Sequence, residues 1–98
     1  MITHLVLVQT KEGTDQAAVQ RLVTDAKRKL ATIQGVRNLS AGVAFRTNAS
    51  FNVGLCMYFE TEQALQTYRD HPVHVNYVKE VFEPVAADFL SFDFHDAA

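Results

Sequence analysis

Hydrophobic residues recur along the chain with two different periods, and these periods predict its secondary structure. β-branched residues and leucines over residues 2–9 predict a strand that ends before the polar residues 11–13. A long amphipathic helix follows, because Thr14 or Asp15 is a good N-cap residue and Gly35 is a good helix terminator. Between them lie apolar residues at helical spacing: Val19, Leu22, Val23, Ala26, Leu30 and Ile33.

Alternating apolar residues predict a β-hairpin after this helix. Residues 36–45 and 51–59 both alternate with a period of two, and the turn between them falls at residues 48–50. The second strand has one strongly apolar face, formed by Phe51, Val53, Leu55, Met57 and Phe59. Its other face, which includes Cys56 and Tyr58, is mixed rather than polar, so we expect both faces of the sheet to be covered.

A proline divides the next helical pattern. A short helix capped by Thr61 should end near Asp70, because Pro72 disfavours helical geometry in the residue before it. Proline is accepted in the first turn of a helix, so a second helix should begin at Pro72 and end near Pro84. Alternation over residues 88–94 predicts the closing strand.

The order of these elements predicts the fold. Strand, helix, strand, strand, helix, strand is the ferredoxin-like βαββαβ order, an α+β fold with a four-stranded antiparallel sheet and its helices on one face. At 98 residues we expect a single domain over residues 1–98. A chain this short has nothing left to cover the second face, so we expect a homodimer in which two sheets face each other as an α/β barrel of eight strands. Alternation alone does not decide which face meets the partner.

Composition and charge exclude several classes of function. Nine basic against eleven acidic residues give a net charge of −2, and only residues 27–29 are consecutive bases, so we expect no nucleic-acid partner. The N-terminal apolar run is too short to span a membrane and has no basic segment before it, so we expect a cytoplasmic protein without a membrane partner. Cys56 is the only cysteine and is interpreted as a buried strand thiol. The isolated glycines form no phosphate loop, so we expect no cofactor.

Candidate chemistry gathers where the two short helices meet. His74 lies four residues before Val78 on the apolar stripe of its helix, so its imidazole should face the sheet. Burial lowers the pKa of an imidazole, and a neutral ring is usable as a general base. Tyr68 could donate a hydrogen bond to a carbonyl oxygen and stabilise an enolate. The alternative is that both side chains belong to the core and have satisfied hydrogen bonds.

The other three histidines could also line this pocket, but each has a structural interpretation as well. His71 stands beside Pro72, where a helix cap is its expected role and a place in the pocket lining is the functional alternative. His4 is a pocket or core residue of the first strand, and it lies near His95 if the first and last strands pair antiparallel. His95 itself is interpreted as a terminal residue. Two imidazoles at His71 and His74 are too few ligands for a zinc site, so we expect no metal.

Several of these residues together carry a family resemblance. They are His4 in the opening strand, Ile33-Gln34-Gly35-Val36 at the first helix end, Gly42, Phe59 before the run Thr61-Glu62-x-Ala64-Leu65-x-x-Tyr68, the element His71-Pro72-Val73-His74, and Asp88-Phe89. In this pattern the chain resembles the stress-responsive A/B barrel (Dabb) domain over residues 2–94. It departs from the family at Gln34, where proline is common, and this position affects a helix end rather than the pocket.

The resemblance implies a homodimeric α+β barrel with a cavity between the helices and sheet of each protomer. Similar proteins include plant stress-associated proteins that form larger assemblies, polyketide cyclases of the olivetolic acid cyclase kind, and uncharacterised bacterial proteins. In the cyclase, the tyrosine and second histidine of this element act on the substrate, and these match Tyr68 and His74, while the opening-strand histidine matches His4.

Three functions therefore remain open. The first is a cofactor-independent cyclase or lyase that acts on a small apolar or carbonyl-containing ligand, with His74 as base and Tyr68 as hydrogen-bond donor. The second is a non-catalytic ligand binder or stress-response oligomer whose histidines only join helix to sheet. The third, by analogy of fold alone, is a cofactor-free monooxygenase.

Overall fold

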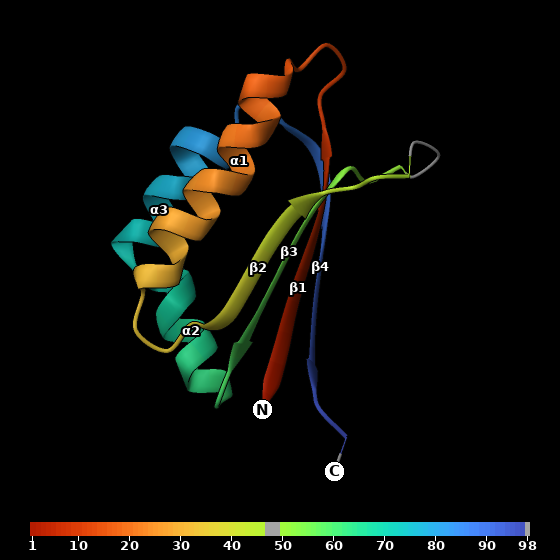
Figure 1. Ribbon diagram of the computed structural model, residues 1–98. Coiled ribbons are helices and arrows are strands. Elements are labelled where there is room, and N and C mark those ends of the chain that lie inside the picture. Colours follow the sequence, from red (N-terminus) through yellow and green to blue (C-terminus); the bar gives the residue numbers. More distant parts are fainter. Residues whose placement is uncertain (47–49, 98) are drawn as a thin grey trace.

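The computed structural model describes residues 1–46 and 50–97 and has two layers, one of helices and one of strands (Figure 1). Its elements are β1 (Ile2–Thr10), α1 (Gln16–Lys29), a 3-10 turn η1 (Leu30–Thr32), β2 (Arg37–Val43), β3 (Val53–Phe59), α2 (Glu62–Asp70), α3 (Pro72–Tyr77), a π-helical turn η2 (Val78–Phe82) and β4 (Ala86–His95). The four strands form one antiparallel sheet in the order β2-β3-β1-β4. This arrangement confirms the predicted ferredoxin-like fold.

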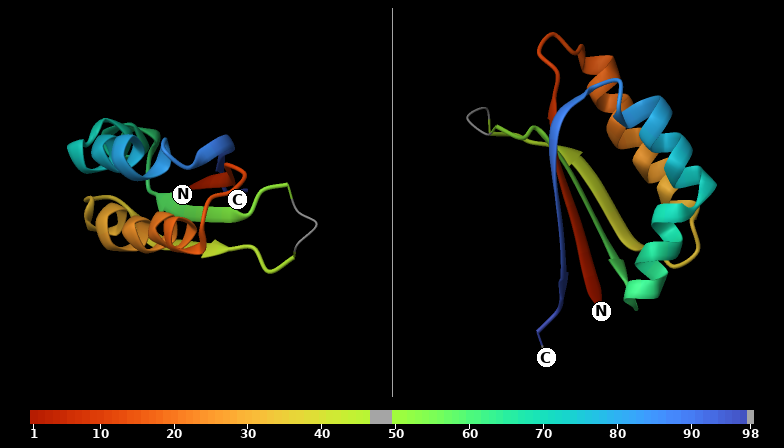
Figure 2. Two further views of the ribbon diagram at one scale, coloured as in Figure 1. Left: turned by 90° about the horizontal axis from the view of Figure 1, so that it is seen from above. Right: turned by 180° about the vertical axis from the view of Figure 1, so that it is seen from behind.

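All helices lie on one face of the sheet, and the core fills the space between the two layers (Figure 2). The apolar face predicted for β3 is the buried one, since Val53, Leu55, Met57 and Phe59 alternate with half-buried neighbours. From the helix layer, α1 contributes the apolar stripe predicted for it. Its fully buried members include Leu22 and Ala26.

Local signals place the ends of the first helix. The Asp15 carboxylate accepts a hydrogen bond from the Ala18 N–H at 2.8 Å, as expected of an N-cap. The α-helix ends at Lys29 rather than at Gly35, because the chain tightens into η1 before it turns. Gly35 has a φ of 99°, a left-handed conformation that favours glycine.

Strand β2 is shorter and less regular than its alternation predicts. It spans Arg37–Val43, and the pairing with β3 shifts between Arg37 and Ser40, next to Asn38 with a φ of 51°. Phe45, which was expected to continue the strand, lies beyond its end and is exposed. Residues 48 and 49 of the predicted turn lie outside the described residues.

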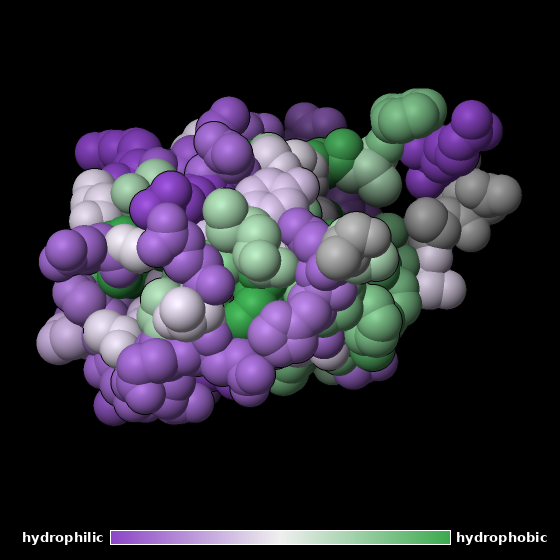
Figure 3. Space-filling view, turned by 90° about the horizontal axis from the view of Figure 1, so that it is seen from below, coloured by the Kyte–Doolittle hydropathy of each residue, from purple (hydrophilic) through white to green (hydrophobic). Residues whose placement is uncertain are grey.

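The second face of the sheet carries no helix or strand of the described residues (Figure 1). In the pairing of β1 with β4, Leu5 lies opposite Phe92 and Leu7 opposite Leu90, and alternation turns all four side chains away from the helices. Phe92 remains 54% exposed and Leu90 50% exposed. Seen from the end that carries both termini, hydrophobic groups gather on the sheet side, whereas the helix side is mostly hydrophilic (Figure 3).

No helix within residues 1–46 and 50–97 is both long enough and apolar enough to cross a lipid bilayer.

Candidate functional site

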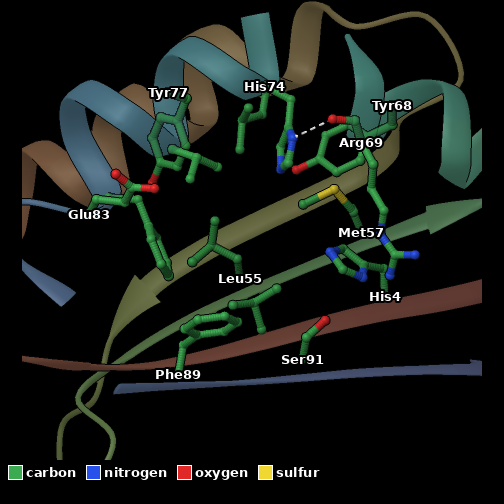
Figure 4. A pocket seen from close by; sticks show the side chains of 14 residues that line it. His4, Leu55, Met57, Tyr68, Arg69, His74, Tyr77, Glu83, Phe89 and Ser91 are labelled. Carbon is green, nitrogen blue, oxygen red and sulfur yellow. Dashed lines mark hydrogen bonds between the residues drawn. The ribbon is translucent and has the colours of Figure 1, made fainter. Parts of the chain in front are cut away.

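A cavity of about 410 Å³ lies between the α3–η2 segment and the sheet (Figure 4). This volume is within the range of roughly 300–1,000 Å³ typical of small-molecule pockets. Most of its wall is apolar and comes from Val6, Leu30, Leu55, Met57, Val78, Phe82 and Phe89. His4, Tyr68, Arg69 and His74 meet at one end of the cavity, Ser91 lies on the sheet side, and Glu83 lies toward the other end.

The break between α2 and α3 positions the two residues first predicted for the site. Tyr68 lies in the last turn of α2 and His74 in the first turn of α3. Between them His71 is extended, and Pro72 begins the new helix. The change of direction brings the rings of Tyr68 and His74 into contact, with centroids 4.5 Å apart.

His74 is held in one tautomer by the backbone. Its Nδ1 lies 3.0 Å from the Arg69 carbonyl oxygen, and a carbonyl can only accept, so Nδ1 carries the hydrogen. Burial lowers the pKa of His74, the bond to the Arg69 carbonyl opposes this effect, and the nearby His4 and Arg69 side chains lower the pKa further. The ring is therefore neutral near pH 7, and its Nε2 has a free lone pair.

The Tyr68 hydroxyl is free to bind a ligand. The residue is only 2% exposed, and its ring packs beside Phe59 and His74. Every fully buried side-chain nitrogen or oxygen of the described residues has a hydrogen-bond partner, whereas Tyr68 Oη has none among these residues. This oxygen is therefore reached from the cavity. Burial raises the pKa of the phenol, so the hydroxyl keeps its proton and can donate it in a hydrogen bond.

His4 reaches the cavity from β1. It is 5% exposed, and its ring lies 6.0 Å from that of Tyr68, centroid to centroid. Its Nδ1 is hydrogen-bonded to Asp93 Oδ1, and Arg69 Nη2 is bonded to Asp93 Oδ2. Asp93 and Arg69 were not among the residues predicted for the site. Arg69 adjoins Tyr68 in sequence, but only the pairing of β1 with β4 reveals Asp93.

His71 and His95 lie outside this group. His71 caps α3 by accepting a hydrogen bond from the Val73 N–H at 3.1 Å, and it does not line the cavity. His95 pairs with Glu62 at 3.0 Å on the surface, two residues along β4 from Asp93. Across the described parts of the chain, no three His, Cys, Asp or Glu side chains converge to hold a metal ion.

Comparison with known proteins identifies relatives over nearly the whole chain. The family model of the Stress responsive A/B Barrel Domain matches residues 2–96. A stress-response A/B barrel domain-containing protein of Arabidopsis thaliana is 28% identical over 95 residues. The match covers 95% of this chain but only 36% of that relative, so the chain spans about a third of its length.

Solved structures share the fold. A Dabb family protein with a ferredoxin-like fold from Mesorhizobium loti has a TM-score of 0.87 at 28% identity, over 99% of this chain and 97% of that one. A dimeric ferredoxin-like protein of unknown function from Thermobifida fusca has a TM-score of 0.85 at 21% identity, over 95% and 88%. The hydroxynitrile lyase of Passiflora edulis has a TM-score of 0.82 at 13% identity, over 95% and 90%.

Proposed function

The chain belongs to the stress-responsive A/B barrel domain family, and we propose that it is a homodimeric protein that binds a small, mostly apolar carbonyl compound in the cavity beneath α3. We further propose that it acts on this compound without a cofactor, as a cyclase or lyase. His74 is the general base, and Tyr68 is the hydrogen-bond donor to the carbonyl oxygen.

One observation carries this proposal: a base and a proton donor face the same apolar cavity with no protein partner among the described residues. His74 Nε2 has a free lone pair because Nδ1 holds the hydrogen. Tyr68 Oη keeps its proton and is likewise unpaired there. An apolar wall excludes water and strengthens hydrogen bonds formed inside it. This combination suits removal of a proton from a carbon next to a carbonyl group.

The proposed reaction begins with that proton transfer. His74 Nε2 takes the proton, and the electron pair of the C–H bond moves onto the carbonyl oxygen, which accepts a hydrogen bond from Tyr68. In a cyclase the resulting enolate carbon then attacks a second carbonyl of the same molecule, and in a lyase it expels a leaving group. The imidazolium returns its proton to the oxygen or group that becomes negative. The hydroxynitrile lyase of the same fold supports a lyase only by analogy of fold.

Exchange of α-hydrogens with D₂O tests the first step directly. We expect the protein to accelerate deuterium incorporation into 1-phenylpropan-2-one or ethyl 3-oxohexanoate, followed by proton NMR. Because His74 is the base, His74→Gln should lower this rate by about 10²- to 10⁴-fold. Tyr68→Phe should lower it by about 10²-fold, because the developing charge loses its donor.

His95→Gln is the matched control, since it removes an imidazole that lies on the surface outside the cavity. Its exchange rate should equal that of the wild type. Exchange at the buffer rate in the wild type, or an unchanged rate in His74→Gln, would reject the catalytic role.

A non-catalytic ligand binder or stress-response oligomer is the second candidate, and the apolar cavity favours the ligand binder of these two. In that case the ketone occupies the cavity without losing a proton. Saturation-transfer NMR would then detect 1-phenylpropan-2-one bound to the wild type, while deuterium incorporation stays at the buffer rate.

The homodimer is supported by the open face of the sheet. A large apolar surface on a protein of this size typically marks an interaction site, and a second copy of the same surface is its simplest partner. The structurally similar protein of Thermobifida fusca is described as dimeric. We propose that the two sheets pack through Leu5, Leu7, Leu90, Phe92 and Phe94.

A further inference from the structure

We propose that Asp93 is a positioning residue that sets the tautomer of His4 and so gives the cavity a second proton-accepting nitrogen, His4 Nε2. This nitrogen would accept its proton from the carbonyl compound of the proposed function. The proton-accepting role of His4 therefore rests on that proposed function. The tautomer is a property of the unliganded protein and can be tested without a substrate.

Strand pairing brings the carboxylate and the imidazole together. His4 of β1 lies directly opposite Asp93 of β4, and both side chains lie on the helix-facing side of the sheet. Asp93 Oδ1 is bonded to His4 Nδ1. An ionised carboxylate has no hydrogen to donate, so Nδ1 must carry it, and Nε2 of the neutral ring is then unprotonated.

The remaining nitrogen of His4 opens onto the cavity. His4 Nε2 has no hydrogen-bond partner among the described residues, and every fully buried polar side-chain atom there has one. His4 also lines the cavity, so the accessible nitrogen faces it (Figure 4). Edge contacts with Phe59 and Tyr68, at centroid distances of 6.3 and 6.0 Å, hold the ring in this orientation.

Arg69 orients both imidazoles of the cavity. Its backbone carbonyl accepts from His74 Nδ1, and its guanidinium holds Asp93 Oδ2, the oxygen that His4 does not use. The two histidines therefore present the same nitrogen, Nε2, to one space, although one is held by a carbonyl and the other by a carboxylate.

The Asp93 carboxylate also helps His4 to hold an additional proton during a reaction. When His4 Nε2 accepts a proton, the imidazolium keeps its hydrogen bond to Asp93, and the negative charge stabilises the new positive charge. With His4 Nε2 as a second proton acceptor beside His74 Nε2, protons can be removed from two carbon atoms of one bound carbonyl compound. In each case the electron pair of the C–H bond moves onto the adjacent carbonyl oxygen. The cavity is thus suited to a substrate with more than one acidic C–H position, such as a β-dicarbonyl compound.

The first experiment is proton–nitrogen correlation NMR of the protein labelled with ¹⁵N-histidine, with His4 assigned from the spectrum of His4→Gln. We expect the wild-type spectrum to show His4 with a protonated Nδ1 and an unprotonated Nε2. Asp93→Asn should move the tautomer balance toward the form with an unprotonated Nδ1, because the amide NH2 can donate to that nitrogen, whereas a carboxylate can only accept from it. Asp88→Asn is the control, because it removes a carboxylate of the same strand that accepts a hydrogen bond from the N–H of Phe89, and it should leave the tautomer of His4 unchanged.

A wild-type His4 that carries its hydrogen on Nε2, or a tautomer that is unchanged in Asp93→Asn, would overturn the proposal. Asp93→Glu keeps the carboxylate and should retain the wild-type tautomer, which separates a loss of charge from a general disturbance of the fold.

The second experiment measures deuterium exchange of ethyl 3-oxohexanoate. We expect Asp93→Asn to lower kcat by about 10-fold or more with little change in KM, and Asp93→Glu to recover part of the loss. A changed tautomer with an unchanged kcat would overturn the role of His4 as an acceptor. If the wild type shows no exchange at all, the proposed function fails, and the NMR result alone decides whether Asp93 positions His4.

Discussion

Two buried tyrosines show at the scale of single residues how the same side chain serves structure or binding. Tyr77 Oη donates a hydrogen bond of 2.6 Å to the Leu22 carbonyl and so joins α3 to α1. Tyr68 is equally buried, yet its hydroxyl has no partner among the described residues and faces the cavity. The first hydroxyl stabilises the fold, and the second is available to a ligand.

Replacing each tyrosine by phenylalanine tests this contrast. Tyr77→Phe should lower the free energy of unfolding by about 1 kcal/mol, because it removes a buried hydrogen bond. Tyr68→Phe should change it by less than about 0.5 kcal/mol, because no bond inside the protein is lost. Urea unfolding followed by circular dichroism measures both. Equal losses would mean that the Tyr68 hydroxyl has a structural role.

The lowered pKa of His74 predicts how stability depends on pH. The unfolded chain, with the ordinary histidine pKa of about 6.5, binds a proton at a higher pH than the folded protein does. The free energy of unfolding should therefore fall as the pH falls below about 6.5, and this effect should end below the lowered pKa. In His74→Gln the effect is absent, so the free energy of unfolding of the wild type should fall relative to that of the variant as the pH falls from above 6.5 toward the lowered pKa of His74. Parallel stability curves would contradict the lowered pKa.

At the scale of elements, the break between α2 and α3 positions the site, because it brings Tyr68 of α2 into contact with His74 of α3. The predicted end near Asp70 and restart at Pro72 are both confirmed. They were predictable because a proline restricts the residue before it through local steric contacts alone. The break also leaves the first N–H groups of α3 without helical partners, and His71 Nδ1 accepts the one from Val73.

His71 should therefore contribute to stability as a helix cap. We expect His71→Ala to lower the free energy of unfolding by about 1 kcal/mol, the usual effect of losing a cap. His71→Asn should lose less, because asparagine is itself a good N-cap residue. Urea unfolding of the two variants provides the measurement. An equal loss in both would show that His71 stabilises the break by some other contact.

At the scale of the whole molecule, the placement of the helices decides which face of the sheet is free. Alternation in β4 places Leu90, Phe92 and Phe94 on one face of the sheet and Phe89 with Ser91 and Asp93 on the other, and it does not by itself decide which set meets a partner. In the structure Phe89 lies on the helix side, with its ring 5.4 Å from that of Phe82, while Phe92 lies on the open face. The proposed dimer must therefore form through the set that includes Phe92.

Phe92→Glu should separate the proposed dimer. A charge in the centre of the joined sheets would be buried without a partner, so we expect the dissociation constant to rise by about 30-fold or more. Val75→Glu is the matched control, since Val75 is an apolar residue of α3 with a similar exposure of 46%. Sedimentation velocity measures both variants. A dimer that persists in both Phe92→Glu and Leu7→Glu would contradict packing through the sheets.

The order of the elements, the apolar faces of α1 and β3, and the placement of Tyr68 and His74 on either side of a proline break were all predictable from the amino-acid sequence. Each of these depends on residues close together in the chain, so local periods and steric rules predict them. The pairing of His4 with Asp93, the contacts of Arg69 that orient both histidines, and the Tyr68 hydroxyl, unpaired among the described residues, became visible only in the folded chain. Alternation has a period of two, so a strand moved by two residues shows the same pattern, and the contact between residues 4 and 93 is set by the register of the folded sheet.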